Sequence, residues 1–297
     1  MREELRVGID SVETVTTLLQ RIRSAHPTKG LFEAADLQWW WRTKRSTDEL
    51  GQLFWFDDDG LPVAAVILVD WGGDVAMAPM IMPDTEGAWV GHVIKRGLAH
   101  AADAGIGGVD LEVDRADQVM HNILLGLGFT TDDDAETASV SVVEAWLPID
   151  ARPEIGPLYD GYRLLRRSDP LVQPHHLNER SGPDVEERLR QTSLYRADLD
   201  LLMVDQNDNH AAHGLFWHDP VTSTGLVEPM RTEDEHQRRG LARAVLTTGL
   251  DLLAEAGAER VKLCFEPDNP PARELYLSVG FEPVKETVVF SGSPTPR

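Results

Sequence analysis

The two halves of this chain repeat one another at an offset of 152 residues. The segment 92–113 aligns with 244–265, and the alignment continues without a gap toward the C-terminus. The matching positions include Gly97 and Gly249, Ala104-Gly105 and Ala256-Gly257, and Gly128-Phe129 and Gly280-Phe281. A period this long points to a duplicated domain, so the repeat predicts two copies of one unit in the 297 residues.

Hydrophobic periodicity gives both copies the same order of elements: strand, helix, hairpin, strand, helix, strand, helix, strand. In the first copy the expected strands are 5–9, 53–56, 63–69, 74–82, 109–113 and 139–146, and the helices are 12–23, 89–104 and 117–127. In the second copy the strands are 162–166, 199–204, 211–217, 225–230, 261–265 and 284–290, and the helices are 184–191, 240–256 and 271–279. This order predicts an α+β, mixed α/β fold with helices packed on a central sheet.

The predicted domain boundaries follow from the repeat. Residues 1–147 form the first domain and 161–291 the second, with 292–297 as a tail. The linker is 148–160, which contains three prolines.

Composition excludes several classes of protein. Cys264 is the single cysteine, so no disulfide can form within the chain, and we expect a cytoplasmic protein. The N-terminal residues do not read as a secretory signal, and no apolar run is long enough for a transmembrane helix. The net charge of −22 disfavours nucleic acids and anionic membranes as partners, because both carry negative charge.

A basic turn in the second copy carries the strongest functional signal. Residues 237–242 read Gln-Arg-Arg-Gly-Leu-Ala and lie between an expected strand and an expected helix. The N–H groups at a helix N-terminus, together with the helix dipole, favour an anion there. Gly240 allows close approach of a ligand to the backbone, and Arg238, Arg239 and Arg243 add positive charge. We therefore predict a phosphate-binding turn, the alternative being a solvated basic face.

These residues resemble the GCN5-related N-acetyltransferase (GNAT) superfamily. Its pyrophosphate loop has the pattern Q/R-x-x-G-x-G/A, which Gln237, Gly240 and Ala242 match. A second family pattern, N-x-x-A-x-x-L/F-Y-x-x-x-G-F, is matched at the family's spacing by Asn269, Ala272, Leu275, Tyr276, Gly280 and Phe281. The resemblance covers 160–291 directly and the first copy through the repeat. Two such units in tandem are similar in architecture to mycothiol synthase.

The resemblance implies acetyl-CoA as donor and, in each unit, a mostly antiparallel sheet with a splayed parallel strand pair. The residues expected to bind the cofactor are Met230, Arg231, Thr232, Gln237, Arg238, Arg239, Gly240, Leu241, Ala242, Arg243, Asn269, Ala272 and Tyr276. Tyr276 stands where the family places the proton donor to the departing thiolate, although it could simply pack on the sheet. Glu228 lies four residues before Thr232 on the same strand, which would place both side chains on one face. We predict Glu228 as the general base, the alternative being an ion pair with Arg231.

The first copy lacks the corresponding residues. At the 152-residue offset, the turn 237–242 maps to 85–90, which contains no arginine and includes Trp89. Glu228 maps to Ala76 and Tyr276 to Leu124. We therefore expect the first copy to be a degenerate unit and the second to be the active one.

The predicted function is transfer of an acetyl group from acetyl-CoA to the amine of a small molecule, by direct attack in the C-terminal unit. The alternatives are an acyl-CoA-binding pseudoenzyme with a regulatory role and an acyltransferase that uses a different acyl-CoA. We expect no metal, because no cysteine or carboxylate completes a recognisable spacing with His175-His176 or with His210-x-x-His213. We expect a monomer, with a dimer as the alternative.

Overall fold

The computed structural model describes all residues except 74, 132–139, 157, 170–173 and 296–297. The chain forms two compact units that are discontinuous in sequence. Unit 1 comprises Met1–Leu37, Lys44–Val143 and Lys285–Arg297, and unit 2 comprises Gln38–Thr43 and Glu144–Val284. The sequence-based boundaries, 1–147 and 161–291, are continuous. The structure differs from them because each unit includes a segment from the other copy.

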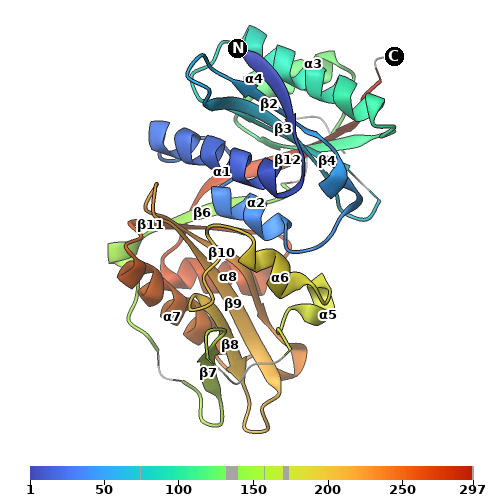
Figure 1. Cartoon of the computed structure of the whole chain (residues 1–297). Helices are drawn as coiled ribbons and strands as arrows, with labels where there is room; N and C mark the ends of the chain where they lie inside the picture. Colours follow the sequence, from blue (N-terminus) through green and yellow to red (C-terminus); the bar gives the residue numbers. More distant parts are fainter. Residues whose placement is uncertain (74, 132–139, 157, 170–173, 296–297) are drawn as a thin grey trace. The chain divides into compact units, whose positions relative to one another are not determined.

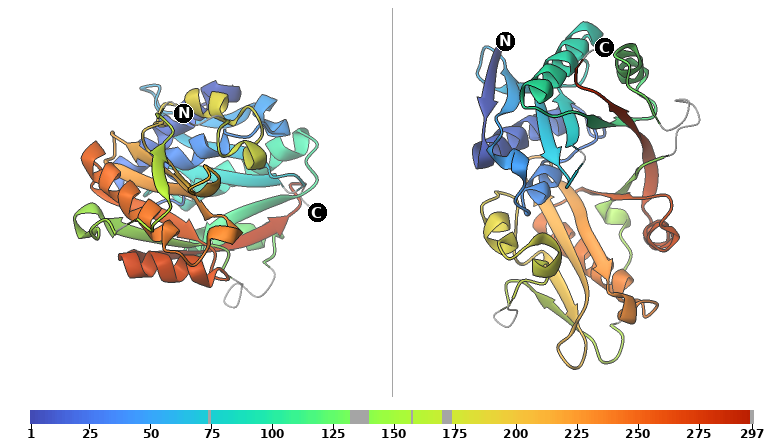
Figure 2. Two further views of the ribbon diagram at one scale, coloured as in Figure 1. Left: turned by 90° about the horizontal axis from the view of Figure 1, so that it is seen from below. Right: turned by 90° about the vertical axis from the view of Figure 1, so that its right-hand side faces the viewer.

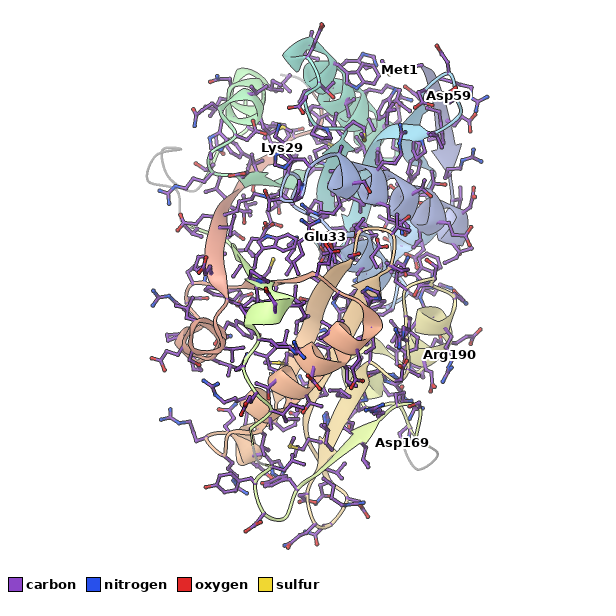
Figure 3. The ribbon with its side chains drawn as sticks, turned by 90° about the vertical axis from the view of Figure 1, so that its left-hand side faces the viewer. Met1, Lys29, Glu33, Asp59, Asp169 and Arg190 are labelled. Carbon is purple, nitrogen blue, oxygen red and sulfur yellow. The ribbon has the colours of Figure 1, made fainter. Side chains whose placement is uncertain are left out.

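Unit 1 contains a half-sheet whose first strands are drawn in blue to cyan in Figure 1 and whose last strand, β12, is drawn in orange to red. Its strand order is β1-β2-β3-β4-β5-β12. The bounds are β1 Arg2–Arg6, β2 Gln52–Phe56, β3 Pro62–Asp70, β4 Val75–Ile81, β5 Val109–Asp114 and β12 Glu282–Gly292. The helices are α1 Gly8–Ala25, α2 Ala34–Trp40, which runs on into unit 2, α3 Gly87–Asp103 and α4 Gln118–Gly126, with the short η1 Ser46–Glu49. A buried ion pair joins Arg23 of α1 to Glu33, which is labelled in Figure 3.

The last strand of the chain, β12, completes the sheet of unit 1. It pairs antiparallel with β5, from Thr287 opposite Asp114 to Gly292 opposite Val109. Val288 and Phe290 of this strand are fully buried in the core of unit 1. From the repeat alone, a strand of the first copy would be expected beside β5. The last strand of the second copy occupies that position instead.

Unit 2 has the strand order β6-β11-β10-β9-β8-β7. The bounds are β6 Val143–Pro148, β7 Arg163–Arg166, β8 Asp200–Val204, β9 His210–Asp219, β10 Thr224–Thr232 and β11 Arg260–Phe265. The helices are α5 Asn178–Ser181, α6 Val185–Arg190, α7 Leu241–Ala256 and α8 Pro270–Val279, with the short turns η2 Ile149–Ala151 and η3 Asp234–His236. Figure 2 shows these elements, in green to orange-red, from two further directions.

The predicted mixed, mostly antiparallel sheet with a splayed parallel pair is confirmed. In unit 2, β10 and β11 are parallel and pair only from Thr224 opposite Arg260 to Leu226 opposite Lys262. Both strands continue beyond that point, β10 to Thr232 and β11 to Phe265, without further pairing between them. In unit 1, β4 and β5 likewise pair only at the start of β4.

Helix α7 is positioned by glycines at its ends and on its buried face. Gly240 and Gly257 flank it with φ of 74° and 98°, left-handed values that glycine adopts without steric cost. Gly249 lies against the ring of Phe216 on β9, so the helix packs closely on the sheet. This packing holds α7 against the sheet. In the sequence, the helix begins soon after β10 ends.

Several sequence-based elements differ from the structure. The strand expected at 5–9 is wrong, because β1 ends at Arg6 and α1 begins at Gly8. Helices α2 and α5 were not expected. The strand expected at 139–146 begins at Val143, and residue 139 lies outside the described residues. Among the described residues, no helix combines the length and the apolar character that crossing a membrane requires.

Candidate active site

The basic turn of unit 2 has a backbone suited to an anion. Arg238 and Gly240 both adopt positive φ, 64° and 74°, on either side of Arg239. Gly240 is the residue before the first turn of α7, whose leading N–H groups have no acceptor in a preceding helical turn. A Cβ added at Gly240 would meet no atom within 4 Å, so the space above this position is open. The turn therefore offers outward N–H groups and room for a ligand, as a phosphate site needs.

The arginines of the turn keep their positive charge available. Arg239 donates to the hydroxyl of Tyr162 at 2.5 Å and to the carbonyl of Glu235 at 3.3 Å. Arg243 donates to Oγ of Ser278 at 2.6 Å and to the carbonyl of the same residue. All of these partners are neutral. Within the described part of the chain, neither arginine nor Arg238 has a carboxylate at ion-pair distance, so the turn is a local positive site in an acidic protein.

Other predicted residues of the turn stabilise it. Gln237 is exposed and donates to Oδ1 of Asp234 at 3.0 Å. Leu241 is buried and anchors the first turn of α7, with Ala242 half-buried beside it. These positions hold the backbone of the turn in place.

Glu228 lies in a β-bulge at the point where β10 leaves β11. The antiparallel register passes from Val227 opposite Phe216 to Met230 opposite Gly214, so three residues of β10 span two of β9. The extra residue interrupts the alternation of side chains, and the argument that Glu228 shares a face with Thr232 therefore does not hold. The indole of Trp217 donates to the carbonyl of Glu228 at 2.8 Å and fixes the backbone there.

Beyond the bulge, Met230, Arg231 and Thr232 are half-buried. Arg231 contacts Glu233 at 3.3 Å and Asp234 at 3.5 Å. The Oγ1 atom of Thr232 is buried and has no hydrogen-bond partner among the described residues. A buried hydroxyl without a partner is costly. Thr232 lies on the part of β10 that still pairs with β9 but no longer with β11, referred to below as the unpaired stretch, where a ligand could bond to the hydroxyl.

Tyr276 of α8 is buried, with its ring packed against Phe265 and Phe281. Burial raises the pKa of Tyr276 above its ordinary value, and repulsion by the charge of Glu228 and then of Cys264 raises the pKa further. The structure thus brings both predicted catalytic side chains close enough for electrostatic interaction. The Tyr276 hydroxyl stays protonated at neutral pH and can act only as a donor of its proton there.

Asn269 and Ala272 have a structural role that the sequence pattern did not separate from ligand binding. The Oδ1 atom of Asn269 accepts a hydrogen bond from the N–H of Ala272 at 3.2 Å, which caps α8. In unit 1, Asp117 caps α4 through Met120 in the same way, at 3.0 Å. The cap orients the helix that carries Tyr276.

The equivalent place in unit 1 is closed to an anion. The residue before helix α3 is Glu86, so an acidic residue occupies the N-cap where unit 2 has Gly240 before α7. Trp89 in the first turn stacks on His92, with 5.0 Å between ring centroids, and packs edge-on against Trp55. Leu124, the counterpart of Tyr276, is fully buried in the apolar core.

Sequence reasoning missed the residues that support the turn and the bulge. Tyr162 holds Arg239 and also contacts Nδ1 of His236 at 3.0 Å, and Ser278 holds Arg243. Trp217 fixes the carbonyl of Glu228. No spacing rule connects these residues with their partners, because each comes from a different element.

Comparison with known proteins agrees with the geometry. The model of the acetyltransferase (GNAT) family matches residues 160–281. A mycothiol acetyltransferase of Corynebacterium aurimucosum is 35% identical over 82 residues, which are 27% of this chain and 27% of that protein. One of Corynebacterium jeikeium is 39% identical over 69 residues, 23% of this chain and 20% of that protein. The match thus spans about a quarter of the length of these curated relatives.

Two solved structures resemble the whole chain. A tandem GNAT protein from the clavulanic acid biosynthesis pathway has a TM-score of 0.70 at 14% identity, covering 100% of this chain and 99% of that one. A GCN5-related N-acetyltransferase from Sphaerobacter thermophilus has a TM-score of 0.61 at 16% identity, covering 99% and 96%. At such identities the likeness speaks for the fold alone. The family match thus assigns residues 160–281 to the GNAT acetyltransferase family, and the whole chain has a tandem GNAT fold.

Proposed function

We propose that unit 2 transfers the acetyl group of acetyl-CoA to the amine of a small molecule, and that unit 1 has no catalytic role. The observation that carries the proposal is the position of Glu228 in the bulge of β10, just past its pairing with β11, with Tyr276 packed against Phe265 at the end of β11. The basic turn that opens α7 lies on the same unit, so anion binding and proton transfer are both available there.

The residues of this chain support each requirement of donor binding. The backbone of Arg238 to Ala242 would hold the pyrophosphate of CoA, and Arg239 and Arg243 would add charge-assisted hydrogen bonds. The unpaired stretch of β10 offers backbone groups and the orphan hydroxyl of Thr232 to the pantetheine arm. Backbone N–H groups near the bulge would polarise the thioester carbonyl.

The transfer needs three proton movements. The acceptor must lose a proton before it attacks, because an ammonium has no lone pair, and Glu228 would accept that proton directly or through water. The amine nitrogen then forms a bond to the carbonyl carbon as the carbon–sulfur bond breaks, and the nitrogen releases its second surplus proton to solvent, which leaves the neutral amide. Tyr276, which keeps its proton, would donate it to the departing thiolate.

The test combines binding with turnover. Acetyl-CoA binding is measured by calorimetry, and turnover by free-thiol release over a panel of amines. That panel includes the acceptor used by mycothiol acetyltransferases, because the curated relatives carry that name. We expect Tyr276→Phe and Glu228→Gln to bind acetyl-CoA like the unchanged protein and to lose at least about a hundredfold in turnover. Glu255→Gln, an exposed carboxylate on α7, serves as the matched control.

Two outcomes would redirect the proposal. Acetyl-CoA binding without turnover of any amine would favour a regulatory acyl-CoA-binding module. Tighter binding or faster turnover with another CoA thioester would favour a different acyl donor. Absence of binding to every CoA thioester would refute the proposal as a whole.

A further inference from the structure

Four histidines and two carboxylates of unit 2 gather on and beside one face of its sheet. They form two groups, His175, His176 and Asp200, and His210, His213 and Glu233, and within each group the ligand atoms lie within 4.8 Å of one another. The ring of His176 joins the groups, because its centroid is 5.0 Å from that of His213 and 5.7 Å from that of His210. We refer to these six residues as the histidine cluster.

The face of the sheet follows from strand alternation. Gly214 and Phe216 of β9 point toward Val245 and Gly249 of α7. His213 therefore points to the opposite face, away from α7. Asp200 comes from β8, the neighbour of β9, and His176 comes from the segment before α5.

The centre of the cluster contains polar atoms without hydrogen bonds. The side chain of His176 is 2% exposed and that of Asp200 is 0% exposed. Both ring nitrogens of His176 and the Oδ1 atom of Asp200 have no hydrogen-bond partner among the described residues. Nε2 of His176 nevertheless lies 3.3 Å from this Oδ1. Such burial costs free energy unless something compensates it, and a cation between the two atoms would bond to both.

The surrounding residues orient the atoms that a metal would use. His175 accepts a hydrogen bond at Nδ1 from the N–H of Leu177 at 3.2 Å, so the neutral ring carries its proton on Nε2. That nitrogen lies 3.1 Å from Oδ2 of Asp200, to which Tyr195 also donates, at 2.9 Å. His175 and Tyr195 thus occupy Oδ2 and leave Oδ1 directed toward His176. Hydrogen bonds of this kind to a ligand carboxylate are typical of metal sites.

His213 is oriented by a chain of polar contacts. Its Nδ1 lies 3.0 Å from Nε2 of His210, and Nδ1 of His210 lies 3.9 Å from Oε1 of Glu233. Glu233 is itself bound by Arg180, at 2.9 Å. If Nδ1 of His213 donates along this chain, its Nε2 keeps a lone pair for a ligand.

We propose that the histidine cluster binds one divalent transition-metal ion of the zinc class, with His176 and Asp200 as direct ligands. His213, whose ring centroid is 5.0 Å from that of His176, is the neighbouring imidazole from β9. The separation of 3.3 Å between Nε2 of His176 and Oδ1 of Asp200 supports this assignment. Zinc bonds of about 2.0–2.1 Å in a tetrahedral site place neighbouring ligand atoms roughly 3.3–3.4 Å apart. Such an ion would link the segment before α5 to strand β8.

Zinc binding to the untagged chain tests the proposal without acetyl-CoA, so the result is independent of the acetyltransferase activity. We expect one zinc per chain after gel filtration, and an affinity, measured by competition with a chromophoric chelator, at least about tenfold higher than that of His176→Leu. His176→Leu should still fold, because leucine replaces a buried imidazole that has no hydrogen bond. His92→Leu, an exposed histidine of unit 1, is the matched control and should bind zinc like the unchanged protein.

Cobalt provides a second measurement that needs no variant. Co²⁺ bound by the unchanged protein should give visible absorption bands of a tetrahedral site, and zinc should displace them. Zinc binding that is equal in the unchanged protein and in His176→Leu would overturn the proposal. So would the absence of both stoichiometric zinc and cobalt bands.

Discussion

The close contact between α7 and β9 predicts a large effect of one added methyl group. A Cβ at Gly249 would lie 2.1–2.3 Å from three ring atoms of Phe216, whose side chain is fully buried. Ordinary carbon contacts are about 3.5–4.0 Å, so the atoms would overlap by about 1.2–1.9 Å. Overpacking of a core costs about 1–3 kcal/mol, and this overlap belongs at the upper end. Replacement of glycine by alanine within a helix also stabilises the helix by about 1 kcal/mol, which offsets part of this cost. We expect Gly249→Ala to lower the free energy of unfolding by about 2 kcal/mol.

Equilibrium urea denaturation measures this difference, and the repeat supplies two comparisons. At Gly97, the counterpart in α3, the added Cβ would lie 2.9 Å from Val66, so Gly97→Ala should cost less. At Gly91 the nearest atom is 4.0 Å away, and Gly91→Ala should stabilise by up to about 1 kcal/mol. Phe216→Leu should recover part of the loss in the Gly249→Ala background. A Gly249→Ala variant as stable as the unchanged protein would refute the reasoning.

Three further predictions concern the site and the pH dependence. Tyr276→Phe should lose turnover to a similar extent at every pH between 6 and 9, because the raised pKa keeps Tyr276 protonated throughout this range. Thiol release measures the turnover, and Tyr159→Phe, at an exposed tyrosine, is the control. Arg243→Ala should weaken acetyl-CoA binding about tenfold at low salt, since a hydrogen bond to a charged group contributes about 1.5–3 kcal/mol. The loss should be smaller at high salt, because salt screens the charge, and calorimetry measures both values. Burial lowers the pKa of His218 below its ordinary value of 6.5. As the pH drops below about 6.5, the unfolded chain therefore takes up a proton that the folded chain does not, and the free energy of unfolding falls. His218→Gln should show a smaller loss in urea denaturation between pH 7.5 and pH 5.

The sequence predicted the elements of the site better than their connections. The repeat and the turn at 237–242 depend on local patterns, and the structure has the expected strand, turn and helix there. The partner of β12 does not depend on a local pattern. Alternating apolar residues such as Val288 and Phe290 determine which face of a strand is buried, but not which neighbour it pairs with. The exchange of β12 into unit 1 therefore could not be read from periodicity.

The histidine cluster was missed for a similar reason. Spacing rules detect metal ligands that share one helix or one hairpin. Asp200 comes 24 residues after His176, and Glu233 comes 20 after His213, each from a different strand or strand end. Only the register of β8, β9 and β10 places the carboxylates beside the imidazoles.

The difference between the two copies lies in the backbone as well as in the side chains. In unit 1, β4 pairs with β3 in an unbroken register from Ile81 opposite Ala64 to Val75 opposite Asp70. The corresponding ladder in unit 2 contains the bulge at Glu228, which frees backbone groups of β10 from the sheet. In unit 1, the positions that correspond to Glu228 and Tyr276 are Ala76 and Leu124, and there the ladder between β3 and β4 is regular. The Asp117 cap of α4, in contrast, keeps the geometry of the Asn269 cap of α8.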